Sequence, residues 1–377
     1  MPGPYPYLGP TGVLAYIDHY RIDEEFAVIG EDGDHFLKFR DKPMTLFFQG
    51  KANVNNHAHV IGDTNRCSPK WFYYWFMHRD LTAALSRQGV GRYKLTKKAL
   101  AELEIWLPSK REQLHIAGIL STWDQAITTT ERLLANSRKQ SQILAHQTLT
   151  GKRRLGHFDK GQGSQPTPHG PIPKDWRYRQ IQEVSAEVGT KLGSAAPHPV
   201  LSCTKHGGLV DSLRYFNKQV FSKDTSTYKV VPKDCFVYAT NHIEEGSIGY
   251  QDLYEFGLVS PMYTVFKTDS SVCDSYLYRL LKTEHYRQIF AAATNASVDR
   301  RGSLRWNEFK KLRIPFPPRD EQEAIASLLI DCERETFLLK SQLESLQTEK
   351  AALMTQLLTG KRRVLLPEIE TEAEAAP

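Results

Sequence analysis

Two long, proline-free stretches of the chain carry mostly apolar residues at every third or fourth position. In the stretch that ends at Gly360, these positions are Leu329, Cys332, Thr336, Leu339, Leu343, Leu346, Lys350, Leu353 and Leu357. In the stretch that ends at Gly151, a weaker version of the same seam runs through Leu120, Trp123, Ile127, Thr130, Leu134, Ser137, Ser141, Leu144 and Thr148. This spacing is typical of coiled-coil helices. Each helix would run about 39 residues, or about 58 Å at 1.5 Å per residue.

The two stretches are copies of one another. Gly151 and Gly360 are 209 positions apart in the sequence. When residues 103–155 are aligned without a gap to the residues 209 positions later, 17 of the 53 are identical. The identities include Glu-Gln near the start of each copy (112–113 and 321–322) and Leu-Thr-Gly-Lys-Arg-Arg at its end. A period this long indicates two copies of a module rather than a solenoid. Two helices related by a pseudo-twofold axis would pack antiparallel.

Each copy carries local signals for where its helix begins and ends. A strand-like run ending in proline precedes it, LEIWLPS in the first copy and LRIPFPP in the second. Ser109 and Glu112 form a capping-box pattern. The terminal glycine suits a left-handed C-cap, and the basic residues after it suit the negative end of the helix dipole. We expect the Leu-Thr-Gly-Lys-Arg-Arg phrase at least to cap each helix. Contact of Lys152, Arg153, Lys361 and Arg362 with phosphate is a secondary hypothesis.

The segments outside the helices predict two similar mixed domains. Residues 174–316 contain strand-like runs (KVVPKDCFVYAT, GLVSPMYTVFKT) and a helix-like run, SYLYRLLKTEHYRQIFAAAT. Residues 1–107 repeat this order, with YPYLGPTGVLAYID in the place of HPVLSCTKHGGLVDS. The first copy lacks an equivalent of PKDWRYRQIQEVSAEVGTKLGSAAP, so we expect an N-terminally shortened first domain. We predict an α+β fold, with curved or barrel-like sheets, two long antiparallel helices and a pseudo-twofold repeat.

The predicted division has six parts. They are a first domain (1–107), a first spacer helix (108–155), a Gly/Pro-rich linker (156–173), a second domain (174–316), a second spacer helix (317–364) and an acidic tail (365–377).

Composition and charge narrow the class of protein. The formal net charge is +6 and the pI is near 8.9, which permits binding to nucleic acid without requiring it. Five cysteines without a C-x-x-C pair suggest neither a disulfide framework nor a zinc site. The N-terminus lacks the features of a secretory signal, and no apolar run is long enough to span a bilayer. We therefore expect a cytoplasmic protein that does not act in a membrane.

The order of domain, helix, domain and helix resembles the specificity (S) subunit of type I restriction–modification systems, over essentially the whole chain. The residues that carry the resemblance are IPFPPRDEQEAIASLL and LMTQLLTGKRR in the helical regions, and YLGPTGVLAYID, GEDG, VNNHAHV and TKHGGLV in the domains. The resemblance implies that each domain is a target-recognition domain for one half of a split DNA site. It also implies that the helices set the distance between the half-sites.

The same resemblance implies the partners and cofactors. The partners would be double-stranded DNA, two modification (methyltransferase) subunits that methylate adenine and dock on the helical regions and on the junctions 105–117 and 314–326, and restriction/translocase subunits. No cofactor would bind this chain. S-adenosylmethionine would belong to the modification subunit, and ATP with Mg²⁺ to the restriction subunit.

Polar and basic residues in predicted loops are the candidates for DNA contact, because such side chains bind base edges and phosphates. For each of them, a solvated turn is the alternative interpretation. The candidates in the first domain are Thr11, Asn55, Asn56, His57 and Arg92. Those in the second domain are Thr204, Lys205, His206, Asn241, Arg300, Arg301 and Ser303.

A search for catalytic equipment leaves the enzyme hypothesis weak. The sequence contains no glycine-rich adenosylmethionine loop followed by an Asn/Asp-Pro-Pro-aromatic motif, and no P-loop. His57 and His59 have a spacing that a metal pair could use, but no third ligand accompanies them. We therefore expect neither catalytic nor metal-binding residues. Two alternatives stay open: a stand-alone nuclease or other DNA-modifying enzyme, and a coiled-coil scaffold that binds proteins without DNA.

Overall fold

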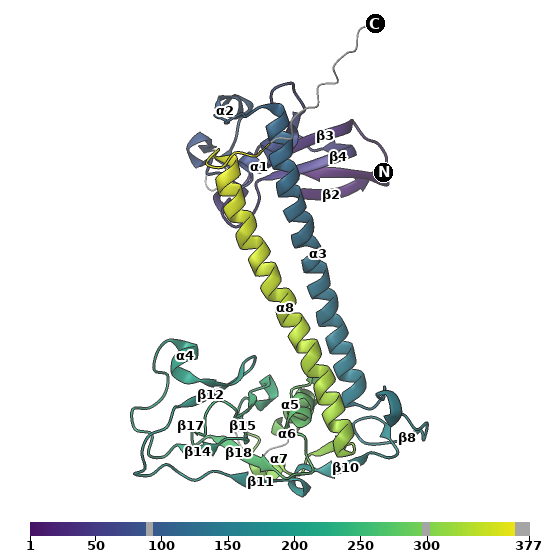
Figure 1. Ribbon diagram of the computed structural model, residues 1–377, viewed down its shortest axis with the longest axis vertical. Helices are drawn as coiled ribbons and strands as arrows, with labels where there is room; N and C mark the ends of the chain where they lie inside the picture. Colours follow the sequence, from purple (N-terminus) through teal and green to yellow (C-terminus); the bar gives the residue numbers. More distant parts are fainter. Residues whose placement is uncertain (88–92, 296–301, 366–377) are drawn as a thin grey trace. The chain divides into compact units, whose positions relative to one another are not determined.

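The computed structural model describes residues 1–87, 93–295 and 302–365. The chain divides into two compact units. Unit 1 comprises Met1–Leu134 and Leu339–Pro377, and unit 2 comprises Ala135–Leu338. Two helices of 40 residues each, α3 (Lys110–Leu149) and α8 (Arg319–Leu358), are divided between the units, α3 after Leu134 and α8 after Leu338. Figure 1 shows both as continuous helices. Among the described residues, no helix has the length and apolar character needed to cross a membrane.

The two long helices end as the sequence predicts. Gly151 and Gly360 have φ angles of +69° and +71°, the left-handed conformation that glycine adopts without strain. Two residues beyond each glycine, a backbone N–H returns to a carbonyl of the last turn: Arg153 to Gln147 and Arg362 to Gln356, both at 3.1 Å. The predicted glycine caps are therefore confirmed in both copies.

Within each unit, the parts of α3 and α8 run antiparallel. Residues further along α3 contact residues earlier in α8. The contacts that show this are Glu112–Arg363 and Asp124–Lys350 in unit 1, and Ser137–Thr336 and Arg154–Glu321 in unit 2. The predicted antiparallel pairing and the mixed helix-and-strand fold are confirmed.

A five-stranded sheet forms the body of unit 1. The strands are β1 (Pro2–Gly9), β2 (Gly12–Ile17), β3 (Ile22–Gly30), β4 (Thr45–Val54) and β5 (Ala58–Gly62), in the order β2-β1-β4-β3-β5. Only β1 and β4 pair in parallel. Further elements are the short strands β6 (Ser86–Arg87) and β7 (Tyr93–Lys94), the helices α1 (Pro69–Phe76) and α2 (Lys97–Glu102), and two short 3-10 helices at His35–Lys38 and Thr82–Ala84. The aromatic face of α1 packs with β3 and with the ends of α3 and α8 that belong to this unit.

Unit 2 has a four-stranded antiparallel sheet in the order β11-β18-β15-β16, with bounds Ser185–Val188, Tyr263–Thr268, Phe236–Ala239 and Ile248–Tyr250. Four strand pairs accompany it: β8 (Ser164–Gln165) with β9 (Ile172–Pro173), β10 (Arg177–Gln180) with β19 (Arg313–Phe316), β12 (Leu201–Thr204) with β13 (Gly208–Asp211), and β14 (Lys229–Pro232) with β17 (Phe256–Val259). The short helices are α4 (Ser212–Phe216), α5 (Asp274–Leu281), α6 (Glu284–Asn295) and α7 (Trp306–Phe309).

One helix predicted in the second domain is in fact two. The run from Ser275 onward divides into α5 and α6. Thr283 lies between them, and its hydroxyl accepts a hydrogen bond from the backbone N–H of Tyr286 at 3.3 Å. A threonine that binds a backbone N–H three residues ahead starts a new helix. The apolar periodicity did not reveal this break, because the helical spacing resumes beyond it.

A buried glutamine attaches each domain to the start of a long helix. The side chain of Gln322 accepts a hydrogen bond from the N–H of Cys273 (2.8 Å) and donates to the carbonyls of Ser271 (3.2 Å) and Pro317 (3.0 Å). Gln113 makes the same three bonds in unit 1, with Ser68 (3.0 Å), Arg66 (2.7 Å) and Pro108 (2.9 Å). Both glutamines are fully buried. The repeated Glu-Gln dipeptide therefore has a structural role: its glutamine joins the start of the long helix to one loop of the domain.

The glutamate of the same dipeptide pairs with the arginine that closes the other copy. Arg363 donates to Glu112 through Nε (2.6 Å) and Nη2 (2.7 Å). Arg154 binds Glu321 in the same bidentate geometry: its Nε donates to Oε1, and its Nη2 donates to Oε2 at 2.6 Å. The last residue of each Leu-Thr-Gly-Lys-Arg-Arg phrase thus binds the first turn of the opposite helix. This pairing requires two copies of the phrase, one for each helix start.

The two strand-like runs before the helices differ in structure, which corrects one prediction. Residues 313–316 form β19, which pairs antiparallel with β10 from Arg177 to Gln180. The equivalent residues 104–107 form no strand. Strand structure requires a hydrogen-bonded partner, and no described segment of unit 1 occupies the position that β10 holds in unit 2. Similar local sequences therefore have different conformations in the two copies.

Candidate nucleic-acid interface

In unit 1, the sheet topology brings two of the predicted loops together. Thr11 lies in the turn between β1 and β2, and residues 55–57 connect β4 to β5. Because β1 and β4 are parallel neighbours, with Leu8 opposite Val54, the loops that follow them leave the same edge of the sheet. A hydrogen bond from the N–H of Asn55 to the carbonyl of Leu8 (2.9 Å) connects them. Thr11, Asn55, Asn56 and His57 thus belong to one group.

Two members of this group already have structural partners. The side-chain oxygen of Asn55 accepts the N–H of His57 at 2.8 Å and so shapes the turn. Nδ1 of His57 lies 3.0 Å from Oδ2 of Asp32. Asn56 and Thr11 are exposed at the same edge, as a residue that contacts a base must be. The structure therefore favours Asn56 and Thr11 over Asn55 and His57 as contacts to bases.

The strand β7 joins the same edge. The N–H of Gly33 donates to the carbonyl of Tyr93 (3.1 Å), and the ammonium of Lys94 lies 3.0 Å from Glu31. The hydrogen bond to Glu31 raises the pKa of Lys94. Arg92, which the sequence predicts to contact DNA, lies outside the described residues. Glu31 balances the positive charge of Lys94.

In unit 2, the hairpin turn between β12 and β13 carries Thr204, Lys205 and His206. The hydroxyl of Thr204 accepts from the N–H of Gly207 (3.0 Å) and donates to the carbonyl of Gly208 (3.2 Å). Thr204 therefore shapes the turn. Lys205 and His206 are exposed. The carbonyl of Lys205 accepts from Nζ of Lys282 at 2.8 Å, which fixes the hairpin to the end of α5.

His206 faces the long helices rather than the other candidates. It lines a cavity of about 440 Å³ together with Arg279, Lys282, Glu333 of α8 and Ser141 of α3. Arg279 is held by Glu333 in two hydrogen bonds of 3.0 and 2.6 Å. The structure thus places His206 in a pocket between the domain and the helices.

Asn241 and Ser303 line a different cavity, of about 700 Å³. Two hydrogen bonds to backbone carbonyls connect segments around the cavity: Nζ of Lys229 donates to the carbonyl of Tyr263 (2.6 Å), and the N–H of Leu304 donates to the carbonyl of Thr240 (2.8 Å). Arg300 and Arg301, predicted in the same loop as Ser303, lie outside the described residues. The structure places Asn241 and Ser303 at the same cavity, which the sequence did not predict.

The sequence analysis missed other residues of this cavity. Lys229, Arg305, Trp306 and Asn307 line it together with the acidic Glu187. Arginine, lysine and asparagine are the side chains that most often contact base edges and phosphates. The signal that could have found them is the run Arg305-Trp306-Asn307, which directly follows the basic loop. Trp306 also packs on Phe266 (ring centroids 5.6 Å apart), so its ring supports the core as well.

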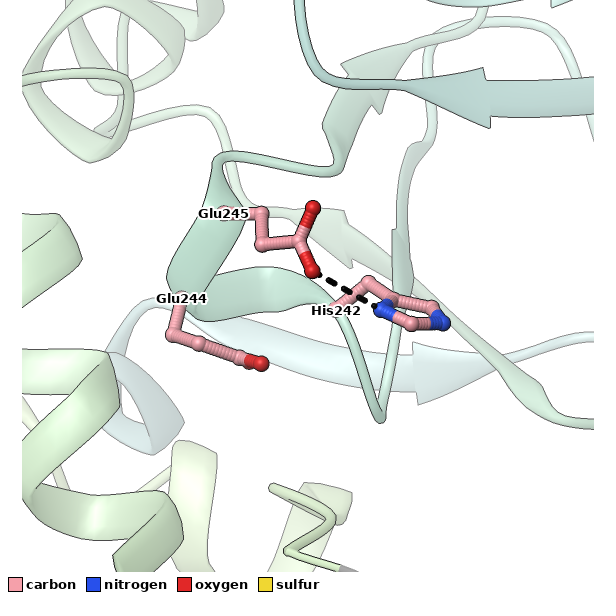
Figure 2. A group of neighbouring side chains, drawn as sticks. All are labelled: His242, Glu244 and Glu245. Atoms are coloured by element: carbon pink, nitrogen blue, oxygen red, sulfur yellow. Dashed lines mark hydrogen bonds and ion pairs between the residues drawn. The ribbon is translucent and has the colours of Figure 1, made fainter.

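The histidines that resembled a metal pair point to different partners. His57 binds Asp32, whereas Nε2 of His59 lies 2.7 Å from the carbonyl of Leu95. In another cluster, the imidazole of His242 and the carboxylates of Glu244 and Glu245 each offer one atom that could bind a metal, and these atoms lie within 4.8 Å of one another. Figure 2 shows the Glu245 carboxylate turned toward His242, with a contact of 3.3 Å. Because His242 and Glu245 are exposed, we interpret this cluster as a surface ion pair beside a second glutamate.

Comparison with known proteins agrees with this architecture. The family model described as "Type I restriction modification DNA specificity domain" matches residues 1–136 and again 173–348. The chain belongs to this specificity family. Both matched segments begin in a domain and extend into a long helix, so each covers one copy of the internal repeat. Within the described residues, all the loops discussed above fall inside the two matches of the specificity family.

Individual members of the specificity family are distant in sequence. A type I restriction enzyme specificity subunit of Methanocaldococcus jannaschii is 22% identical over 389 residues, covering 97% of this chain and 87% of that protein. Among solved structures, the type I restriction–modification S subunit from M. genitalium superimposes with a TM-score of 0.56 at 15% identity. That match covers 94% of this chain and 88% of the other. At this level of identity, the structural match shows a shared fold.

Proposed function

We propose that this chain is the DNA-reading subunit of a type I restriction–modification complex, with each domain binding one half of a two-part duplex site. The observation that carries the proposal is the duplicated attachment of a domain to a helix start. Gln113 and Gln322 make equivalent bonds in the two units, so the protein presents the same kind of recognition domain twice. Two copies suit a site with two halves, by the same logic that relates dimeric proteins to paired half-sites.

The proposed DNA contacts are the loop edge of unit 1 and the Asn241 cavity of unit 2. In unit 1 they comprise Thr11 and Asn56, and in unit 2 they comprise Asn241, Ser303 and Lys229, with Lys205 on the β12–β13 hairpin. Amides and hydroxyls can distinguish base pairs in the major groove, whereas lysine neutralises phosphate. Arg92, Arg300 and Arg301 remain part of the proposal on the basis of the sequence.

The long helices have two proposed roles. Their uninterrupted length would define the gap between the half-sites, since each is 40 residues long and an α-helix rises 1.5 Å per residue. Their outward faces would dock modification subunits. Large apolar side chains stay exposed on the part of these helices in unit 2: Ile143, Ile330, Phe337 and Leu338. Exposed apolar patches of this kind mark protein–protein contacts.

In this proposal, the chain itself performs no chemistry. Two modification subunits would bring S-adenosylmethionine and methylate adenine, and restriction subunits would bring ATP and Mg²⁺. Complexes of this kind would assemble in the cytoplasm.

The test is to express the chain with its modification subunit in a methylation-free host and to map methylated adenines by long-read sequencing. A split motif with two short halves and a fixed gap is the expected result, and Asn241→Ala should alter only one half. A palindrome or a single half-site would contradict independent recognition by the two units. Methylation or cleavage by the purified chain alone would favour the enzyme alternative, and a complex that binds no duplex would favour the scaffold.

A further inference from the structure

A short β-hairpin, formed by β8 and β9, lies in the linker that follows α3. Its turn is closed by a hydrogen bond from the N–H of Gly170 to the carbonyl of Thr167 at 3.1 Å. Ile172, at the base of the hairpin, is 6% exposed and belongs to the main core of unit 2. Most of residues 166–170, which we call the hairpin tip, are exposed. The base is therefore fixed in the core, and the tip is the part that can open separately.

Three histidines from three different segments meet at this tip. His146 lies in the last turn of α3, His169 in the hairpin tip, and His285 in the first turn of α6. All three line one cavity of about 40 Å³, together with apolar side chains such as Leu149 and Leu280. The rings of His169 and His285 meet edge to face, with their centroids 5.8 Å apart. The contact between the hairpin tip and α6 is thus made by two imidazoles.

The charged groups around this histidine cluster are positive. Nζ of Lys152 lies 3.1 Å from Nε2 of His146. An ammonium group can only donate, so this nitrogen of His146 accepts and carries no proton. Among the described residues that line the cavity, none is an aspartate or a glutamate. The neighbouring Glu284 is exposed and accepts a hydrogen bond from Arg287 at 2.6 Å. A proton added to the cluster would therefore have no carboxylate in the cavity to balance it.

The other elements packed against the cluster bring no negative charge. Strand β10 contributes Tyr178, whose ring lies 6.5 Å from that of His169 and whose buried hydroxyl has no hydrogen-bond partner among the described residues. Helix α6 contributes Tyr286, and its hydroxyl donates to the carbonyl of Arg313 at 2.9 Å. Thr283 lines the cavity between α5 and α6. The guanidinium of Arg313, in β19, donates to the carbonyl of Tyr178 and adds another positive charge nearby.

This environment favours neutral imidazoles. Burial lowers the pKa of His285, and the positive charges of His169, His146 and Lys152 lower it further. A histidine whose pKa is lowered by folding stabilises the folded state fully above its unfolded pKa of about 6.5. That contribution decreases as the pH falls below this value. The closed position of the hairpin tip is thus compatible with neutral histidines and is opposed by charged ones.

We propose that the hairpin tip is an acid-sensitive clasp, which lies closed over the cavity while His146, His169 and His285 are neutral and opens when they are protonated. Protons reach the cluster from solvent, because His146 and His169 are exposed. Each added proton places a positive charge beside the others, and movement of the tip separates these charges by carrying His169 into water. The base of the hairpin stays anchored through Ile172. This inference does not depend on DNA binding.

The experiment measures hydrogen exchange of the full chain by mass spectrometry, with a chelator present so that no metal ion holds the histidines together. Exchange rates are divided by those of an unstructured chain at the same pH. Protection of residues 164–172 should fall by up to about tenfold, for each histidine that must stay neutral, between about pH 7.5 and about pH 5.5. Protection of β15, in the central sheet of the same unit, should stay constant and serves as the internal reference.

Substitutions at one position separate charge from packing. His285→Phe keeps a ring at the contact but cannot be protonated, so the dependence on pH should largely disappear. His285→Lys carries a permanent charge and should leave the tip open at both pH values. His146→Thr introduces the residue found at the equivalent position of the other copy, Thr355, and should weaken the dependence. His242→Gln is the matched control, because His242 is an exposed histidine that does not line this cavity, and it should behave as the wild type.

Four outcomes would overturn the clasp. The first is protection of residues 164–172 that does not change with pH in the wild type. The second is an undiminished dependence on pH in His285→Phe, and the third is its loss in His242→Gln. The fourth is an equal loss of protection in β15, because the response would then be general unfolding in acid rather than opening of the hairpin tip.

Discussion

Arg154, which follows α3, and Glu321, in the first turn of α8, form a buried ion pair although 167 residues separate them. The side chain of Glu321 is 1% exposed and also accepts the indole N–H of Trp176 at 2.9 Å. Burial by itself lowers the pKa of Arg154, but the hydrogen bonds to Glu321 and Asp175 outweigh this and raise it. The pair fastens the end of one helix to the start of the other, and Arg363 with Glu112 does the same in the other copy.

Arg154→Ala is expected to destabilise the protein strongly. Glu321 would remain buried without its charge partner, and loss of one member of a buried pair costs about 3–5 kcal/mol. Arg363→Ala provides the matched comparison. Arg363 is 69% exposed but Glu112 is only 3% exposed, so this variant also leaves a buried carboxylate without its partner. Among the described residues, it breaks no second ion pair like that of Arg154 with Asp175, so the loss should be smaller than for Arg154→Ala but larger than the range of about 0–1 kcal/mol typical of solvent-exposed pairs. Urea denaturation of both variants measures the difference, and equal losses would contradict the asymmetry between the two pairs.

Asp175 should give part of this stability a dependence on pH. The hydrogen bonds from Arg154 lower the pKa of Asp175 below its ordinary value of 3.8. A carboxyl group whose pKa is lowered by folding stabilises the folded state fully above its unfolded pKa, and the contribution disappears as pH falls through the folded pKa. The stability difference between the wild type and Asp175→Asn should therefore be constant above pH 5 and shrink below pH 3.8. A difference that grows on acidification would contradict this pairing.

Gly151→Ala should destabilise the protein by more than the strain of its positive φ angle alone. A Cβ at Gly151 would lie 2.3 Å from Cδ of Pro173, and at Gly360 it would lie 2.9 Å from the ring of Trp106. Strain and crowding together should cost about 2–4 kcal/mol at Gly151. Gly161→Ala is the control, because Gly161 also has a positive φ (+63°) but nothing within 4 Å of a Cβ. Its cost should be about 1 kcal/mol. Thermal unfolding separates the two, and similar values would show that crowding at Gly151 is unimportant.

Replacement of the anchoring glutamines should loosen the attachment of the domains. Gln322→Ala removes three hydrogen bonds to backbone groups and leaves the buried N–H of Cys273 without its acceptor. We expect a loss of about 2–4 kcal/mol, from net values of about 1 kcal/mol per bond. Gln113→Ala should have a similar effect through Ser68. Hydrogen exchange at Cys273 and Ser68 provides the local readout: unchanged protection would mean that the glutamines are not the anchors.

Arg300 and Arg301 test the assignment of DNA contacts from sequence. Alanine at a residue that contacts a base should cost about 1–3 kcal/mol and relax one position of the site, whereas at a phosphate contact it should weaken all sequences alike. Competition binding with single-base variants of the mapped site distinguishes the two. Lys311→Ala provides a comparison in the same region, because Lys311 is exposed and pairs with the neighbouring Glu308. If Arg300→Ala changes neither affinity nor site choice, Arg300 is not a contact.

Several predicted site residues turned out to shape turns. Asn55 and Thr204 were selected because amides and hydroxyls in loops can contact bases, but the same groups satisfy nearby backbone N–H groups in this structure. The residue type alone cannot distinguish a base contact from a hydrogen bond to the backbone of the same loop, since both require a short polar side chain in a turn. The distinction depends on whether the side chain points back to its own loop, which is a three-dimensional property. Asn241 and Ser303 line one cavity only because the fold packs together loops that are 62 residues apart in the sequence.

Local patterns and repetition in the sequence were enough to predict two long helices, the glycines at their ends and the duplicated order of domain and helix. Helical periodicity and capping involve residues only a few positions apart, so a short stretch of sequence is enough to recognise them. Tertiary structure decided which conformation residues 104–107 and 313–316 adopt, because a strand exists only where another segment pairs with it. It also decided that each terminal arginine binds the opposite copy, because only folding brings charges so distant in sequence within hydrogen-bonding distance.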